Sequence, residues 1–482
     1  MNDAIAVRNP RTGATDYWIT PPTHEQLVAQ CLHLRQAQMA WHGSGLGPRI
    51  EALQQWKQAI AAHRAELTDA LVADTGRRSI SVLEVDSLLA GIDRWCRLAP
   101  ELLLETDRPT AIPFVRLQQT AVPYPLVGVI SPWNFPLLLA TIDTVPALLA
   151  GCAVIVKPSE IAPRFITPLL KTIAAVPALK AVLAYIEGAG ETGAALIEQV
   201  DAVCFTGSVA TGRRVAEAAA RRFIPAFLEL GGKDPAIVLA SANLDLATAA
   251  ILWGGVVNTG QSCLSIERIY VAESIFQPFV AQLVARAQHL SLAYPTVEDG
   301  AIGPIIAERQ AQIIADHLED AVAKGAIVHS GGKIERWNGG LWCRPTVLTQ
   351  VNHTMRVMTE ETFGPLLPVM PFATVEEAIQ LANDTPYGLS AAVFAGSDAA
   401  AIHVAKSLDA GAISVNDAAL TAVMHEGEKQ AFKFSGLGGS RMGPAALQRF
   451  MRKKAFLVKT NAIADPWWFD EVRTAGTDPA ER

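Results

Sequence analysis

The stretch from residue 126 to residue 230 constrains the fold most, because short runs of branched apolar residues alternate there with helical segments. Parallel strands need a crossover of about a dozen residues between them, whereas antiparallel strands can be joined by a tight turn. The alternation therefore predicts an open parallel sheet with right-handed crossovers. The predicted strands are Val127–Ile130, Ala153–Lys157, Leu183–Ile186, Ala202–Phe205 and Ala226–Glu229, and the helices between them are predicted at 137–149, 163–175, 192–199 and 211–220.

A second series of strands and helices runs from residue 236 to about residue 435, and Gly231-Gly232 is the candidate joint between the two series. Prolines at 123 and 125 exclude a central strand near them and favour an exposed hairpin. The sequence thus predicts an α/β fold with two open parallel-sheet domains and a small hairpin. Amphipathic helices are predicted at 23–41, 48–74 and 79–104. The first domain comprises 1–107 with 125–231, and the second domain comprises 232–435. The extended strands span 108–124 and 450–462.

The composition limits the partners and the compartment. The chain has 482 residues, and its formal net charge of −7 disfavours nucleic acid and anionic membrane as partners. Its most apolar stretch, 126–156, contains three prolines that a membrane-spanning helix would tolerate poorly. No signal peptide is apparent, and the six cysteines lack the spacing of a metal site. We therefore expect a cytoplasmic protein with reduced thiols and no bound metal.

Three residues suggest acyl-thioester chemistry. Cys263 ends a turn of small residues, Glu229 precedes a glycine pair, and Asn134 lies on a loop stiffened by prolines. A thiol nucleophile, a carboxylate base and an amide donor for an oxyanion are the groups that such chemistry needs. Each residue also has an ordinary interpretation, respectively as a small buried side chain, a surface carboxylate and a turn residue.

Seven motifs in order decide between these interpretations. They are SPWNFP at 131–136, VKPSE at 156–160, FTGS at 205–208, LELGGKDP at 228–235, GQSC at 260–263, EETFGP at 360–365 and NDTPYGLSAAVF at 383–394. In this order and spacing the chain resembles the NAD(P)-dependent aldehyde dehydrogenase superfamily. The resemblance covers nearly the whole chain, and it implies that residues 1–107 and 125–231 form an NAD-binding domain and residues 232–435 a catalytic domain.

The resemblance assigns catalytic roles. It implies that the Cys263 thiolate attacks an aldehyde, that Asn134 and the Cys263 backbone N–H hold the oxyanion, and that Glu229, expected at a buried strand end, activates water. After hydride leaves for the nicotinamide, water would hydrolyse the thioester to the free acid.

Cofactor residues follow from the same resemblance. Lys157 and Glu160 are expected to hold the adenosine ribose, and the Glu160 carboxylate favours NAD over NADP because it would repel a 2′-phosphate. Ser208 and Gly207 precede a predicted helix whose N-terminus suits the pyrophosphate. Trp133 is expected to line the same cleft, Glu361 to bind the nicotinamide ribose, and Phe363 to pack beside the nicotinamide. Gly188–Gly193 also fits GxGxxG, but no acidic residue follows at about 20 positions, so we interpret it as a tight turn.

The substrate side departs from the family. QAFKFSG at 430–436 and SGLGGSRMG at 435–443 are atypical, and Asp143 stands where relatives often carry lysine. The expected substrate is a small-molecule aldehyde of apolar or aromatic character, because the residues expected to line the tunnel are mostly apolar: Phe135, Leu138, Ile142, Ser262 and Leu264.

Two other functions stay open at this point. One is a non-catalytic NAD-binding or structural protein that retains the fold, and the other is a thioester or ester hydrolase. The resemblance also implies a homodimer or homotetramer whose subunits share the strands at 108–124 and 450–462.

Overall fold

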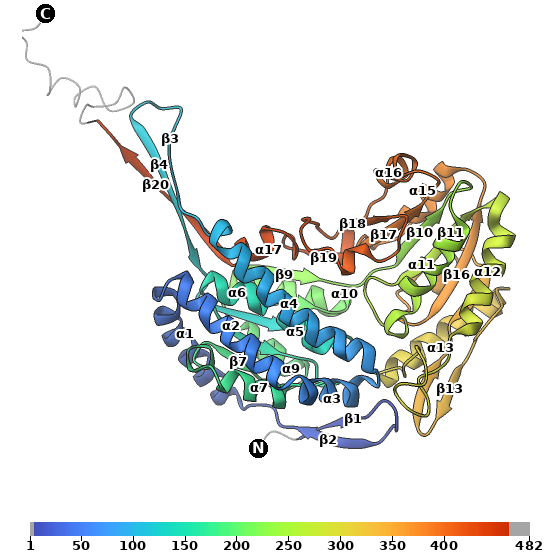
Figure 1. Cartoon of the computed structure of the whole chain (residues 1–482), viewed down its shortest axis with the longest axis horizontal. Coiled ribbons are helices and arrows are strands. Elements are labelled where there is room, and N and C mark those ends of the chain that lie inside the picture. The colour runs from blue at the N-terminus through green and yellow to red at the C-terminus, as the bar shows by residue number, and fades with distance from the viewer. Residues whose placement is uncertain (1–3, 462–482) are drawn as a thin grey trace, which may run out of the picture.

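The computed structural model describes residues 4–461, which form two lobes and a projecting arm (Figure 1). The first lobe is built on the parallel sheet predicted for residues 126–230. A sixth strand, β19, comes from far along the chain and pairs antiparallel with β9. This pairing places Gly436 beside Glu229 in one sheet. The sheet order is β19 (Gly436–Leu437), β9 (Ala226–Glu229), β8 (Ala202–Thr206), β5 (Leu126–Ile130), β6 (Ala153–Lys157) and β7 (Leu183–Tyr185).

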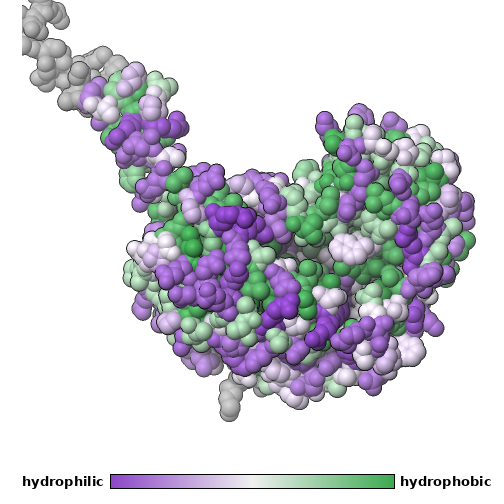
Figure 2. All heavy atoms as spheres, in the orientation of Figure 1, coloured by the Kyte–Doolittle hydropathy of each residue, from purple (hydrophilic) through white to green (hydrophobic). Residues whose placement is uncertain are grey.

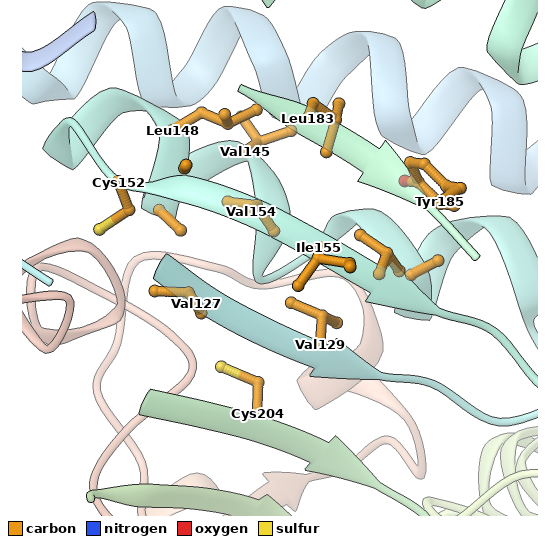
Figure 3. Close-up of a cluster of buried hydrophobic side chains, with 14 of the residues drawn as sticks. Val127, Val129, Val145, Leu148, Cys152, Val154, Ile155, Leu183, Tyr185 and Cys204 are labelled. Atoms are coloured by element: carbon orange, nitrogen blue, oxygen red, sulfur yellow. The ribbon is translucent and has the colours of Figure 1, made fainter. Parts of the chain in front are cut away.

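Helices pack on this sheet and form one continuous apolar core with it. Figure 3 shows Val127 and Val129 of β5, Val154 of β6 and Leu148 of a covering helix within that core. The lobe's helices are α1 (His24–Gly43), α2 (Leu46–Ala62), α3 (Arg64–Thr75), α4 (Arg78–Leu102), α5 (Pro136–Thr141), α6 (Thr144–Ala150), α7 (Ile166–Ala174), α8 (Pro177–Lys180), α9 (Gly190–Ile197), α10 (Val209–Arg222) and α17 (Ala445–Gln448).

The second lobe is built on a seven-stranded sheet that is covered on both faces. Ile237 and Tyr270 belong to one core cluster, whereas Ala236, Val238 and Ile269 belong to another, because successive strand residues point to opposite faces. The sheet order is β12 (Ile327–Val328), β15 (Thr346–Thr349), β16 (Leu366–Phe372), β11 (Ile266–Ala272), β10 (Asp234–Val238), β17 (Ser390–Phe394) and β18 (Ala412–Val415), parallel except for β12. The helices are α11 (Leu244–Val256), α12 (Phe276–His289), α13 (Glu308–Ala323), α14 (Arg356–Thr359), α15 (Val375–Asn383) and α16 (Asp398–Ala405).

The two open parallel sheets confirm the predicted fold class. Figure 2 shows that the surface is hollowed between the lobes. Gly231 and Gly232 connect β9 to β10 across this junction, and neither position has room for a side chain. A Cβ on Gly231 would lie 2.5 Å from a Glu361 carboxylate oxygen, and one on Gly232 would lie 2.7 Å from the carbonyl oxygen of Cys263.

The arm is a three-stranded antiparallel sheet of β3 (Thr106–Pro109), β4 (Val115–Pro123) and β20 (Met451–Lys459), which projects from the first lobe (Figure 1). Here the expectation of no central strand near Pro123 is wrong. Strand β4 lies in the middle of the arm, and Pro123 is tolerated because β3 pairs only with residues 116–119, so β4 has a free edge at Pro123. Residue 462 of the predicted strand lies outside the described residues, as do residues 1–3 of the predicted first domain.

Two predicted helices are broken. The helix predicted over 48–74 is divided at His63, which leaves the helical conformation with φ −104° and ψ 17°. The helix predicted over 137–149 divides into α5 and α6, because Pro146 has no N–H for the carbonyl of Ile142 and its ring crowds that carbonyl.

The sequence did not reveal two hairpins, β1 (Ile5–Arg8) with β2 (Thr15–Ile19) and β13 (Ile334–Trp337) with β14 (Gly340–Cys343). They meet at Gly13 and Gly339, where added Cβ atoms would collide with the opposite backbone. Within residues 4–461, no helix combines the length and the apolar character that crossing a membrane requires.

Candidate active site

The loop that carries Cys263 is held in an unusual backbone conformation. Asn258, Thr259 and Gly260 have consecutive positive φ values of 57°, 59° and 69°. Thr259 is fully buried, and a Cβ on Gly260 would lie 2.3 Å from the backbone of Gly364, so the loop packs directly against the EETFGP motif. Among the cysteines, all within the described residues, Cys263 alone is partly exposed. It is therefore the thiol that a substrate can reach.

The segment that carries Asn134 lies against the same loop. The Asn134 side-chain amide donates to the carbonyl oxygen of Gln261 at 3.0 Å, and Asn258 donates to the Asn134 carbonyl oxygen at 3.0 Å. Arg77 donates to that carbonyl oxygen at 3.1 Å. The Asn134 amide has two N–H groups, so one is left to point elsewhere. An oxyanion on Cys263 is the ligand we expect for it.

Charges around Cys263 affect its thiol in opposite directions. Burial is the main cause that raises the pKa of Cys263, to about 12, and the carboxylates of Glu361, Asp234 and Glu229 raise it further. Lys429 acts against them, and the Arg441 guanidinium also interacts electrostatically with Cys263. The side chain is partly exposed, yet its surroundings are dense enough for desolvation to dominate. A cofactor or substrate that brings positive charge or hydrogen-bond donors would favour the thiolate.

Glu229 ends β9 at the junction of the lobes. Its register neighbours are Thr206 of β8 and Gly436 of β19. Glu229 was expected to be buried, but it is partly exposed, although its neighbours Phe227, Leu228 and Leu230 are buried. This exposure gives water access to the carboxylate.

A buried cluster of opposite charges lies beside this strand end. Arg441 donates to Thr206 and to Asp143, and Asp143 also pairs with Arg449. Arg441 and Glu229 interact electrostatically. Asp143 is thus held by two guanidinium groups, and these pairs explain how its buried charge is tolerated.

Lys157 and Glu160 come together after β6, as the VKPSE motif suggested. The Lys157 ammonium donates to the carbonyl oxygen of Gly188 at 2.7 Å and lies 3.6 Å from the Glu160 carboxylate. Burial lowers the pKa of Lys157. Gly188 therefore belongs to this site, although its GxGxxG context was interpreted only as a turn. Glu160 remains partly exposed and can accept hydrogen bonds from ribose hydroxyls.

Ser208 is the N-cap of α10, which begins two residues earlier than predicted. Its hydroxyl accepts from Thr211 N at 3.3 Å and lies 3.1 Å from the Thr211 hydroxyl. Gly207 precedes it, and a Cβ there would lie 2.6 Å from the Phe205 ring. The exposed start of a 14-residue helix leaves backbone N–H groups free for an anion such as a pyrophosphate.

Trp133, Glu361 and Phe363 meet at the other end of the junction. The Trp133 and Phe363 rings contact edge to face at 5.5 Å. Glu361 accepts from Gly232 N at 3.1 Å, and burial is the main cause that raises the pKa of Glu361 to about 8. Glu361 and Phe363, predicted for the nicotinamide half, and Trp133, predicted to line the cleft, therefore lie close to the Cys263 loop.

The five residues predicted to line the tunnel share one property: each is partly exposed within an otherwise buried segment. They are Phe135, Leu138, Ile142, Ser262 and Leu264. A side chain that lines a tunnel must be partly exposed, and these side chains of the α5 and Cys263 segments meet that condition.

Sequence reasoning missed three charged residues of this region. Glu267 is buried against Thr362 and Phe363, Lys429 acts on the Cys263 thiol, and Arg441 interacts with Glu229. Only Glu267 could have been noticed in the sequence, because it is the first charged residue after Cys263. It is the second residue of β11. Lys429 and Arg441 lie in the atypical loop, whose path could not be inferred from family motifs.

The chain is similar to known proteins along its whole length. The model of the aldehyde dehydrogenase family matches residues 1–456. The structure of a putative aldehyde dehydrogenase PutA from Anabaena variabilis is 70% identical, with a TM-score of 0.96, and covers 97% of this chain and 100% of that one. Betaine aldehyde dehydrogenase from Staphylococcus aureus in complex with NAD+ is 31% identical, with a TM-score of 0.89, and covers 97% and 93%.

Two curated relatives have different substrates in their names. A putative succinate-semialdehyde dehydrogenase [NADP(+)] 2 from Mycobacterium ulcerans is 38% identical over 82% of this chain and 77% of its own length. A 4,4'-diapolycopene aldehyde oxidase from a Methylomonas species is 37% identical over 93% and 85%.

Proposed function

The chain belongs to the aldehyde dehydrogenase family, and from that premise we propose that it oxidises an aldehyde to the carboxylic acid with NAD as acceptor. The observation that carries the proposal is the convergence of two loops and one strand end. Cys263, Asn134 and Glu229 come from separate segments and meet at the junction of the two sheets, and Cys263 is the accessible thiol there.

Each residue then has a defined task. The Cys263 thiolate adds to the aldehyde carbon, and the new oxyanion receives hydrogen bonds from the free Asn134 N–H and the Cys263 backbone N–H. When the carbonyl re-forms, hydride leaves the former aldehyde carbon, and bound NAD would supply the acceptor for it. Glu229 takes a proton from a water molecule, which attacks the thioester and releases the acid and the thiol.

The residues present fit a dinucleotide. Lys157 and Glu160 offer a donor and an acceptor to ribose hydroxyls, the exposed N-terminus of α10 suits a pyrophosphate, and Glu361 interacts electrostatically with Cys263. We propose NAD rather than NADP, because the Glu160 carboxylate would repel a 2′-phosphate. Some relatives are named for NADP, and the proposed preference of this chain for NAD rests on its Glu160 carboxylate.

We propose an apolar or aromatic aldehyde as substrate. Four of the five partly exposed side chains expected to line the tunnel are apolar: Phe135, Leu138, Ile142 and Leu264. The name of the Methylomonas relative also refers to an apolar aldehyde, whereas that of the Mycobacterium relative refers to one that carries a carboxylate. A panel of straight-chain, aromatic and carboxylate-bearing aldehydes separates these possibilities.

We also propose a cytoplasmic homodimer or homotetramer assembled through the arm. Phe456 and Leu457 of β20 are 47% and 74% exposed, and apolar side chains on a projecting sheet favour contact with another subunit. Light scattering of Leu457→Asp should show smaller particles than the wild type.

Purified protein tests the function directly. With NAD and a suitable aldehyde it should produce NADH, and Cys263→Ala should abolish this production. Tight NAD binding without NADH formation would instead indicate a non-catalytic protein, and ester hydrolysis without NADH formation would indicate a hydrolase.

A further inference from the structure

Thr362 lies between Glu361 and Phe363, and all its polar atoms are engaged by other segments. Its hydroxyl accepts from the Lys233 ammonium at 3.0 Å and contacts His317 Nδ1 at 3.0 Å. Its carbonyl oxygen accepts from the Gln310 side chain at 2.6 Å. The loop 360–364 is therefore held from several sides.

The centre of this arrangement is the buried carboxylate of Glu267. One oxygen accepts from Thr362 N at 2.7 Å and from the Lys233 ammonium at 2.6 Å, and the other accepts from Phe363 N at 2.8 Å. Glu267 is 2% exposed and Lys233 is 1% exposed. A buried ion pair is tolerated when further hydrogen bonds satisfy its atoms, and here two backbone N–H groups do so.

Phe363 needs such support because of its backbone. Its φ of 51° lies in the left-handed region, which is unfavourable for a bulky residue. Strained conformations of this kind persist only where surrounding contacts determine them. The bond from Phe363 N to Glu267 and the edge contact of its ring with Trp133 are the contacts that do so.

We propose that Glu267 is a positioning residue for dinucleotide binding, which fixes the loop 360–364 so that Glu361 and Phe363 are presented to the nicotinamide half. The inference rests on the proposed cofactor role of these two residues. Glu267 does not touch the cofactor itself. It acts through the backbone of the two residues that follow Glu361, and Lys233 holds its carboxylate in place.

The expected effect of a change at Glu267 on NAD affinity depends on the fraction of molecules whose 360–364 loop is in the binding conformation. When only a fraction of the molecules has the competent loop, the apparent Kd rises by the inverse of that fraction. A glutamine at 267 has one acceptor oxygen and one NH2 group, so it cannot accept from both backbone N–H groups through two oxygens. Leaving a buried donor unsatisfied corresponds to a change of about ten- to a hundredfold.

The test compares Glu267→Gln with the wild type in two assays without aldehyde. NAD binding is followed by tryptophan fluorescence, and hydrolysis of p-nitrophenyl acetate reports on Cys263 without dinucleotide. We expect the Kd for NAD to rise about ten- to a hundredfold, with ester hydrolysis retained. The control is Glu335→Gln. Glu335 lies on β13 and forms an ion pair with Arg344 at 2.8 Å, so its replacement should change neither NAD affinity nor ester hydrolysis.

Unchanged NAD affinity in Glu267→Gln would overturn the proposal, as would parallel loss of NAD binding and ester hydrolysis, which would indicate a general structural role. If Glu267→Gln fails to fold, Thr362→Val is the second test, because it removes only the hydroxyl contacts. This variant should raise the Kd for NAD with ester hydrolysis retained. An unchanged Kd for NAD in Thr362→Val would also overturn the proposal. A wild-type protein that binds NAD but oxidises no aldehyde would refute the proposed function and leave this inference standing.

Discussion

The side-chain amide of Asn134 lies 3.0 Å from the carbonyl oxygen of Gln261, two residues before Cys263. Asn258 donates to both the Asn134 and the Gln261 carbonyl oxygens, at 3.0 and 2.9 Å, so two segments that are 127 positions apart are locked together. The donor proposed for the oxyanion is thus fixed relative to the thiol before any substrate arrives. Preorganisation of this kind is what makes such donors effective in catalysis.

Replacement of Asn134 by alanine should therefore slow the chemistry without weakening NAD binding. We expect kcat to fall about 10²–10³-fold, because loss of one oxyanion donor costs about 3–4 kcal/mol. Ester hydrolysis should fall in parallel, since it passes through the same kind of oxyanion. A kcat close to that of the wild type, with an unchanged melting temperature, would remove Asn134 from the mechanism.

The reactivity of Cys263 toward iodoacetamide should increase with pH well into the alkaline range, because the pKa of its thiol is raised to about 12, chiefly by burial. Lys429→Met should slow alkylation, since it removes a cation that lowers the pKa of the thiol. Glu361→Gln should speed alkylation only above about pH 8, where the wild-type carboxyl is charged. Lys453→Met, on the exposed face of the arm, is the control, and equal rates in all four proteins would contradict this electrostatic account.

Fold stability should depend on pH through Glu84. Burial raises the pKa of Glu84 from 4.5 to about 7, so between these values the folded state holds a proton that the unfolded state has lost. The free energy of unfolding therefore falls as pH rises through this window, by about 3 kcal/mol for this group.

Glu84→Gln should remove that part of the dependence. One Glu84 oxygen accepts from both Leu137 N and Leu138 N, and the other has no hydrogen-bond partner, so an amide can replace the neutral acid. Urea unfolding at about pH 5 and about pH 8 measures the difference. A variant that loses as much stability as the wild type over this range would exclude Glu84 as a source of the dependence.

Coenzyme preference should change at Glu160. Glu160→Gln removes the charge that would repel a 2′-phosphate, so kcat/KM with NADP should rise relative to that with NAD. Glu198→Gln, at the far end of α9, should leave the ratio unchanged. An unaltered ratio in Glu160→Gln would place the discrimination elsewhere.

Local periodicity was sufficient to predict most strands of the first sheet. The strands β5, β6, β8 and β9 agree with their predicted ranges to within one residue at each end, because buried parallel strands are continuous apolar runs between turns. The kinks at His63 and Asp143 were not predicted from amphipathic spacing, since the apolar pattern continues through both breaks. Strand β19 could not be predicted either, because a two-residue strand is defined only by the pairing of Gly436 with Glu229.

Motifs identified the residues of the candidate site, but not what supports them. Cys263, Asn134 and Lys157 stand in recognisable local sequences, so their neighbourhood could be anticipated. Glu267 and Arg441 act through contacts between segments distant in sequence, and no local pattern distinguishes a buried supporting charge from a solvated one.

The acyl-enzyme is the species that tests the central claim most directly. Glu229→Gln, mixed with NAD and an aldehyde substrate, should accumulate a thioester because water is no longer activated. Peptide mass spectrometry should then find one acyl group on Cys263 together with one equivalent of NADH. NADH formation without an acyl group on Cys263, or continued formation in Cys263→Ala, would contradict the account.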